Sequence, residues 1–161
     1  LTTVAAPAQP LPAGGNGFEI ERSYFTLDGD PVNVSEVEQN ERYVVVLRFT
    51  EYNRWPSQVV MTDLLPAGFE IDNPRLVGSA ELANFEWLGE ANAAHVEFRY
   101  DRFTAAFERN ADSPREQVAA YVVRAVNPGV YVHPAATVED MYRPQFSART
   151  ATGAMEVLAP R

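Results

Sequence analysis

The stretch RYVVVLRFTE, residues 42–51, decides the fold of this chain. Its density of β-branched and aromatic residues is typical of a strand and disfavours a helix. Successive side chains of a strand point to opposite sides, so one face is strongly apolar and carries Tyr43, Val45, Leu47 and Phe49. The other face carries Val44, Val46, Arg48 and Thr50. We therefore predict a strand here whose first face lies on a hydrophobic core.

Segments with the same two-residue period follow one another along the chain. They are residues 18–24, 57–65, 96–101, 103–107, 116–126, 130–138 and 154–158. Stretches rich in glycine and proline, such as Asn127-Pro128-Gly129, separate them and predict turns. We expect Phe69–Asp72 to continue the strand 57–65 after a turn, and 96–101 to pair with 103–107 as a hairpin.

Many short strands without intervening helices predict an all-β fold, an antiparallel β-sandwich. One short helical turn is compatible with this fold at Ser79–Asn84, where Ser79 would cap its first turn. The 161 residues suffice for one domain with its own core. Residues 1–17, rich in alanine, proline and glycine, predict an extended interdomain linker, and residues 18–161 form the domain.

Composition narrows the classes of function. The net charge of −9 argues against nucleic acid as a partner and against direct contact with an anionic membrane surface. The chain has no cysteine, and all 13 basic residues are arginine, so neither thiol nor lysine chemistry is available. No apolar run is long enough to span a membrane.

The residues that could perform acid–base or metal chemistry are isolated or scattered. His95 and His133 lack neighbouring ligands at the short spacings of metal sites, so we interpret both as structural or surface residues. The acidic run with Glu36, Glu38 and Glu41 is typical of a solvated edge, and Asp28-Gly29-Asp30 of a turn. We predict no metal, no cofactor and no enzymatic activity.

The segment VEDMYRP, residues 138–144, differs from the other turns. It places Met141 beside Tyr142, and both residue types are enriched where one protein surface meets another. The alternative is that Met141 or Tyr142 packs beneath the end of the sandwich. The residues by themselves do not separate these two interpretations.

Four segments together resemble the C-terminal macroglobulin domain of bacterial α2-macroglobulins. They are GFEIERSYF (17–25), DLLPAGFEIDNP (63–74), YVVRAVNPG (121–129) and VEDMYRP (138–144). The resemblance covers about residues 17–158 and implies a sandwich of the macroglobulin type. The ordered set that includes EDMYRP is more specific than the DLLPAGFE motif, which other bacterial sandwich repeats share.

The resemblance implies a part in a broad-spectrum protease inhibitor. In that family a protease cleaves a bait region, and a thioester then captures the protease covalently. The domain similar to this chain packs on the thioester domain of the same polypeptide and shields the thioester until cleavage. Met141, Tyr142 and Arg143 are the residues to which the resemblance assigns this contact. It also implies a periplasmic parent, anchored to the inner membrane by an N-terminal lipid outside this chain.

Two departures restrict what the resemblance carries over. Without cysteine, the chain holds neither the thioester nor the lipid-anchor cysteine. Without lysine, it cannot bind a receptor in the way of the eukaryotic counterpart of this domain, which uses lysines. The competing function is a structural or adhesive sandwich module of a secreted or cell-surface protein. A thioester motif upstream in the same reading frame would favour the inhibitor.

Overall fold

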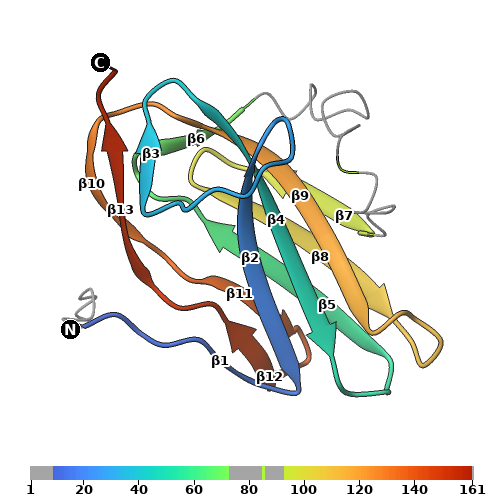
Figure 1. Cartoon of the computed structure of the whole chain (residues 1–161). Coiled ribbons are helices and arrows are strands. Elements are labelled where there is room, and N and C mark those ends of the chain that lie inside the picture. Colours follow the sequence, from blue (N-terminus) through green and yellow to red (C-terminus); the bar gives the residue numbers. More distant parts are fainter. Residues whose placement is uncertain (1–8, 73–84, 86–92, 161) are drawn as a thin grey trace.

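The computed structural model describes residues 9–72, 85 and 93–160, which form strands β1 to β13 (Figure 1). The strands are β1 (Gly14–Asn16), β2 (Phe18–Thr26), β3 (Glu36–Glu38), β4 (Arg42–Glu51), β5 (Ser57–Leu64), β6 (Phe69–Ile71), β7 (His95–Phe98), β8 (Arg102–Arg109), β9 (Glu116–Ala125), β10 (Gly129–His133), β11 (Ala136–Asp140), β12 (Arg143–Arg149) and β13 (Gly153–Leu158). The predicted all-β class is confirmed. The helical turn considered at Ser79–Asn84 lies outside the described residues.

The strands form two main sheets and a smaller third one. The six-stranded sheet has the order β1-β12-β11-β5-β8-β7, and the four-stranded sheet has the order β2-β4-β9-β6. The third sheet, β10-β13-β3, contains the one parallel pair among the described strands, β13 with β3. Figure 1 shows β2, β4 and β9 lying across β5 and β8, as in an antiparallel sandwich.

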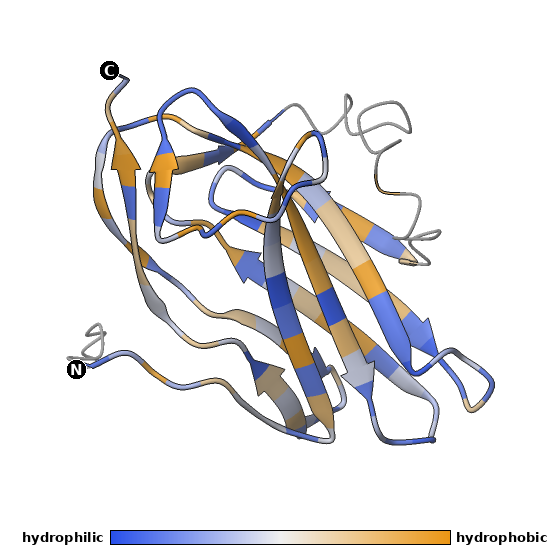
Figure 2. Cartoon of the chain, in the orientation of Figure 1, coloured by the Kyte–Doolittle hydropathy of each residue, from blue (hydrophilic) through white to orange (hydrophobic). Residues whose placement is uncertain are grey.

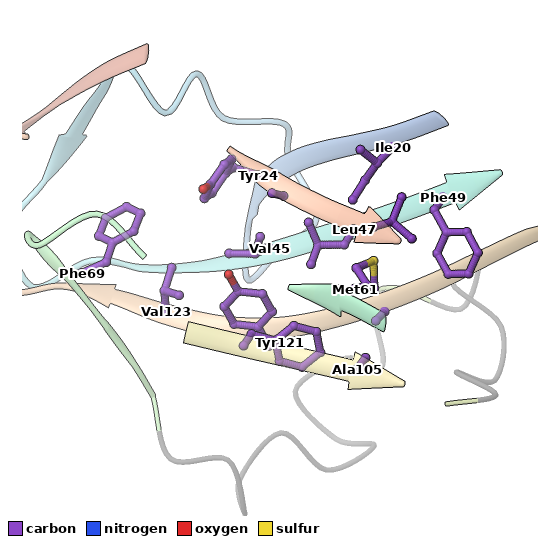
Figure 3. Close-up of a cluster of buried hydrophobic side chains, with 14 of the residues drawn as sticks. Ile20, Tyr24, Val45, Leu47, Phe49, Met61, Phe69, Ala105, Tyr121 and Val123 are labelled. Atoms are coloured by element: carbon purple, nitrogen blue, oxygen red, sulfur yellow. The ribbon is translucent and has the colours of Figure 1, made fainter. Parts of the chain in front are cut away.

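The main core fills the space between the four-stranded and six-stranded sheets (Figure 3). Phe49 of β4 contacts Phe107 of β8 edge to face, with ring centroids 5.1 Å apart. Phe103 of β8 stacks on Tyr121 of β9 at 4.5 Å. These ring pairs join the two sheets. Each fully buried side chain of this size contributes about 1.5–3 kcal/mol through burial.

The central stretch RYVVVLRFTE forms β4, as predicted, and its first face lies on this core. Along its neighbour β2, hydrophobic and hydrophilic residues alternate (Figure 2). The second face of β4 is also buried, because Val44 and Val46 join a separate cluster with Val122 and Phe85. Apolar residues on both faces are typical of a strand covered on both sides.

The stretch Phe69–Asp72 does not continue the preceding strand, so that prediction was wrong. Phe69–Ile71 forms β6 and pairs with β9 in the four-stranded sheet, whereas β5 belongs to the six-stranded sheet. The turn before β6 moves the chain from one sheet to the other. A side chain at Gly68 would overlap the ring of Tyr131, with a Cβ only 2.5 Å from a ring atom, so glycine permits this passage.

The expected strand over residues 130–138 is two strands in different sheets. Gly129–His133 is β10, and Ala136–Asp140 is β11 in the six-stranded sheet. Pro134 lies at the break, and proline has no backbone N–H to donate to a ladder. Its carbonyl accepts a 2.7 Å hydrogen bond from the Arg22 guanidinium, which ties the break to β2.

Part of the expected linker belongs to the domain. Gly14–Asn16 forms β1 and pairs with β12 at the edge of the six-stranded sheet, which corrects the prediction for these residues. Only glycine fits at position 15, because the Cβ of any other residue would lie 2.3 Å from the carbonyl oxygen of Phe18. That residues 1–17 join this domain to another stays a prediction. No helix in the described part of the chain has the length and hydrophobicity to cross a membrane.

Candidate interaction site

Met141 and Tyr142 form the turn of the β11–β12 hairpin at one end of the sandwich (Figure 1). Their exposed fractions are 57% and 77%, so neither side chain packs beneath the sandwich end. Large apolar side chains held this far out of the core are available to another surface. The structure thus separates the two interpretations of this segment that its sequence left open.

A buried carboxylate holds this turn in one conformation. Asp140 is fully buried, and its Oδ1 accepts a 3.0 Å hydrogen bond from the backbone N–H of Tyr142. An aspartate that bonds the backbone two residues ahead stabilises a tight turn. The N–H of Met141 donates to the carbonyl of Gln58 at 2.8 Å, which ties the turn to β5. The backbone beneath the two exposed side chains is therefore firmly attached to the six-stranded sheet.

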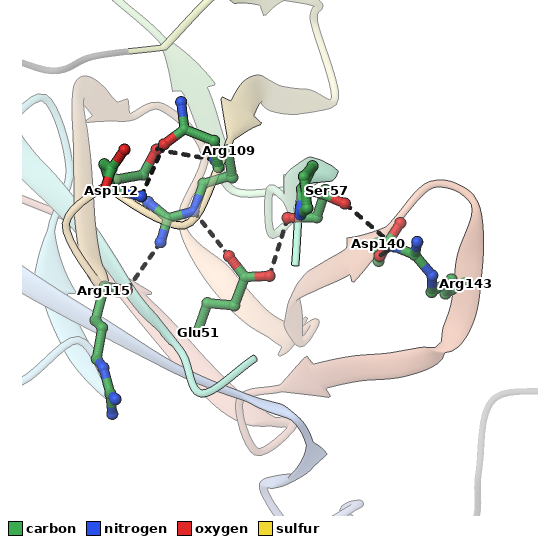
Figure 4. Close-up of polar contacts among 10 residues, drawn as sticks. Glu51, Ser57, Arg109, Asp112, Arg115, Asp140 and Arg143 are labelled. Atoms are coloured by element: carbon green, nitrogen blue, oxygen red, sulfur yellow. Dashed lines mark hydrogen bonds and ion pairs between the residues drawn. The ribbon is translucent and has the colours of Figure 1, made fainter. Parts of the chain in front are cut away.

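Arg143, the third residue assigned by the resemblance, connects this turn to the β4–β5 loop (Figure 4). Its Nη1 donates to Asp140 Oδ2 at 3.1 Å and to the carbonyl of Pro56 at 3.3 Å. Its guanidinium lies over the ring of Trp55, 5.4 Å from the centroid. The ring of Trp55 also contacts Phe146, with ring centroids 5.1 Å apart. Arg143 therefore fixes the position of two loops relative to each other.

A second ion pair, buried on both sides, supports the same end of the molecule (Figure 4). Nε of Arg109 donates to Glu51 Oε2 at 2.8 Å, and the Ser57 hydroxyl donates to Glu51 Oε1 at 2.9 Å. Both charged side chains are at most 4% exposed. The pair joins the ends of β4, β5 and β8. It gives the loops a rigid base without placing a free carboxylate on the surface.

Sequence reasoning missed Asp140 and Trp55 as parts of the site. Asp140 lies within the quoted EDMYRP segment, where an aspartate two residues before a tyrosine is a usable signal for a side-chain-stabilised turn. Trp55 is separated from Arg143 by 88 residues of sequence, so no local pattern indicates their contact. Only the pairing of β5 with β11 brings the two loops together.

The two histidines do not form a catalytic site. His133 shares a 2.8 Å hydrogen bond with the hydroxyl of Tyr24 through its Nε2. Burial, with a smaller contribution from the Arg22 charge, lowers the pKa of His133 to about 3, so it is neutral. His95 is exposed on the edge strand β7. The prediction of structural and surface histidines is confirmed.

The carboxylates considered for chemistry lie on a solvated edge. Glu36 and Glu38 are exposed on β3, an edge strand of the three-stranded sheet, while Val37 between them is buried. Asp28-Gly29-Asp30 lies in a turn, with Gly29 at a φ of 95°. Among residues 9–72, 85 and 93–160, no three histidine or acidic side chains are grouped so as to hold a metal ion.

Residues 17–145 match the family described as the bacterial α2-macroglobulin MG10 domain. The chain belongs to this family. The resemblance found in its sequence is therefore confirmed for the domain. Because this is a family of macroglobulin domains, the prediction that the chain is not an enzyme is confirmed as well.

Full-length relatives of this MG10 domain are much longer proteins. It is 37% identical to the α2-macroglobulin of Escherichia coli K12 over 158 residues, which cover 92% of this chain but only 9% of that protein. The native conformation of the Escherichia coli protein superposes with a TM-score of 0.82 at 31% identity, covering 95% of this chain and 10% of that one.

A further structure is Escherichia coli α2-macroglobulin activated by porcine elastase, with a TM-score of 0.79 at 31% identity. It covers 96% of the MG10 domain and 14% of that chain. The fold of the domain is therefore shared with a native and an activated relative. The chain described here corresponds to about a tenth of the native relative.

Proposed function

We propose that this MG10 domain packs against the thioester domain of a longer inhibitor and shields the thioester until the bait region is cleaved. The contact is made by Met141 and Tyr142, with Arg143 holding the turn in place. The observation that carries the proposal is their exposure on a turn whose backbone is fixed by the fully buried Asp140.

The physical requirement for such a shield is the exclusion of water. A thioester persists only where water and other nucleophiles cannot approach it, so its cover must be apolar and must release on demand. An aromatic ring and a thioether meet this requirement, and because their backbone is already fixed, docking does not have to order the turn. The chain itself contains no cysteine, so the thioester belongs to another part of the parent.

The parent, in this proposal, inhibits proteases by trapping them. A relative that is activated by porcine elastase supports a protease as the partner of the whole molecule. We further propose that the parent resides in the periplasm, held by an N-terminal lipid outside this chain. Fractionation of cells that express the tagged parent tests this location, and recovery in the cytoplasmic fraction would contradict it.

The decisive experiment replaces both exposed residues in the full-length parent, Met141→Ala with Tyr142→Ala. We expect spontaneous thioester loss, measured as the appearance of a free thiol with a thiol-reactive dye, to become at least about tenfold faster. That factor corresponds to about 1.4 kcal/mol of interface energy, a modest loss for an aromatic contact. The thermal midpoint of the 161-residue chain should stay unchanged, because both replaced side chains are exposed to solvent in this domain.

The matched control is Val130→Ala with Val132→Ala. These side chains are 71% and 65% exposed on β10, away from the β11–β12 turn, and should leave the thioester rate unchanged. An unchanged rate in the Met141/Tyr142 variant would reject the shield. A lowered thermal midpoint of the 161-residue chain in that variant would instead make the pair structural. Either outcome would favour a structural module.

A further inference from the structure

The docking surface at this end of the domain includes a second loop, residues 52–56 between β4 and β5. Trp55 in this loop is 36% exposed although its ring packs against Arg143 and Phe146. An indole that is held by two neighbours and still partly exposed is positioned for contact with another surface. One of these neighbours, Arg143, is the residue that joins the β11–β12 turn to this loop.

The second loop and the turn are joined by hydrogen bonds. Arg143 bonds the carbonyl of Pro56 on the loop and the carboxylate of Asp140 beneath the turn. The N–H of Met141 also bonds the carbonyl of Gln58, two residues after Pro56. A partner that contacts Tyr142 therefore meets Trp55 in a fixed relative position, without ordering either loop on binding.

The charge of this surface is opposite to that of the chain. The chain carries a net charge of −9, yet residues 52–56 and 141–146 contain two arginines, Arg54 and Arg143, and no acidic residue. The carboxylates that adjoin the two loops along the chain, Glu51 and Asp140, are buried and paired with Arg109 and Arg143. An exposed carboxylate, Glu19, lies at the start of the loop 52–56 and accepts a 2.6 Å hydrogen bond from the Tyr52 hydroxyl. Within the two loops themselves the exposed charged side chains are arginines, beside the apolar side chains of Trp55, Met141 and Tyr142.

We propose that Arg54, Trp55 and Arg143 join Met141 and Tyr142 in one two-loop docking surface. Its occupant is an apolar patch with carboxylates at its rim, on the thioester domain of the parent. This inference rests on the proposed shielding function, and it adds a third apolar contact and an electrostatic requirement. Complementary charges at the rim of an interface set the register of docking and are weakened by salt.

The test uses the full-length parent and the thiol-release rate. Trp55→Ala and Arg54→Glu should each speed thioester loss several-fold, by about 5- to 10-fold if each contact contributes as a typical interface residue does. Raising the salt concentration should speed loss in the wild type and slow it in Arg54→Glu, because salt screens the attraction in the first and the repulsion in the second. Arg99→Glu is the matched control, because Arg99 lies in the β7–β8 turn at the opposite end and its side chain is 58% exposed. It should leave the rate unchanged.

Trp55→Phe keeps an aromatic ring in contact with Arg143 and Phe146 and should restore most of the protection that Trp55→Ala loses. If Arg54→Glu and Trp55→Ala release thiol at the wild-type rate while the Met141/Tyr142 variant is fast, the two-loop surface is wrong and the shield stands. If all three behave as the wild type, the proposed shielding function fails too. Equal acceleration by Arg99→Glu would overturn the charge requirement.

Discussion

Two aspartates of this domain are buried to the same degree and serve different purposes. Asp63 is 1% exposed and lies between the sheets, where Arg22 and the Tyr121 hydroxyl bond its carboxylate. Asp140 is 0% exposed and lies beneath a surface turn, where the Tyr142 N–H and Arg143 bond it. The side chain of Arg22 is 4% exposed, whereas that of Arg143 is 42% exposed.

The difference between their arginine partners decides what each aspartate does. Loss of Asp63 would leave the positive charge of Arg22 inside the core, where desolvation is costly. Loss of Asp140 would leave Arg143 free to turn toward water. The first pair therefore holds the sheets together, and the second fixes the geometry of the proposed docking surface. Burial of a carboxylate alone does not show its role.

The core pair is part of a larger network with His133. Arg22 also donates to the Pro134 carbonyl, and its guanidinium lies 5.9 Å from the ring of Tyr24, which bonds His133. Burial raises the pKa of Asp63, although the Arg22 charge and the Tyr121 hydroxyl act in the opposite direction. The network connects β2, β5, β9 and β10, and hence all three sheets.

The largest effect on stability is expected from removing the aspartate in the core. Asp63→Ala should lower the free energy of unfolding by about 3–5 kcal/mol, because Arg22 is left buried without its counter-charge. Urea denaturation of the 161-residue chain measures the change. The double variant Arg22→Met with Asp63→Leu should lose less, since it removes both charges. Surface substitutions usually change the free energy of unfolding by no more than about 0.5 kcal/mol. A loss of only that size in Asp63→Ala would show that water reaches Arg22.

The second prediction concerns the pH dependence of the same network. The pKa of His133 is lowered from an unfolded value of about 6.5 to about 3, so the native state favours the neutral ring. Stability from this residue is complete above pH 6.5 and is lost as the pH falls toward 3. Between pH 7 and 5 the loss should reach about 2 kcal/mol.

The check is the difference in unfolding free energy between the wild type and His133→Asn, measured at several pH values. Asparagine does not titrate, so the difference should shrink as the pH falls from 7 to 5. A difference independent of pH would mean that His133 is protonated as easily in the native state as in the unfolded chain.

The smallest effect on stability is expected at the turn. Asp140→Ala should cost about 1–2 kcal/mol, because it removes hydrogen bonds near water without stranding a buried charge. Asp140→Asn should cost less, since its amide oxygen can still accept from the Tyr142 N–H. In the full-length parent, however, Asp140→Ala should speed thiol release, whereas Asp63→Ala should do so only where the domain unfolds. A cost at Asp140 equal to that at Asp63 would remove the distinction between the two sites.

Much of the fold was predictable from local sequence patterns. Alternation found β2, β4, β5, the β7–β8 hairpin, β9 and β13. Each of these strands except β7 has a buried face, and on β7 only Phe98 packs against the core. The same pattern could not assign strands to sheets. Residues 69–71 and 129–133 lie in other sheets than the strands expected to include them. At both breaks the chain contacts a distant residue, Tyr131 at Gly68 and Arg22 at Pro134, which no local pattern reveals.

The candidate site, too, was predictable only in part. Residue types and the family resemblance identified Met141, Tyr142 and Arg143, since large adaptable side chains in a turn suggest a contact surface. They did not reveal that the first two side chains are exposed, nor that Trp55 belongs with them. Which side chains are exposed, and which lie beside one another, depends on which strands pair. The pairing of β5 with β11 joins residues about 80 positions apart, such as Met61 and Val138.

The amino-acid sequence by itself determined that this protein is built of strands, lacks thiol chemistry and carries a distinctive Met-Tyr turn. These properties follow from residue type and short-range periodicity. Only the tertiary structure decided that Asp63 stabilises the core while Asp140 positions a surface. The physical reason is that the effect of a buried charge depends on whether its partner can reach water, and the sheet pairing sets that access.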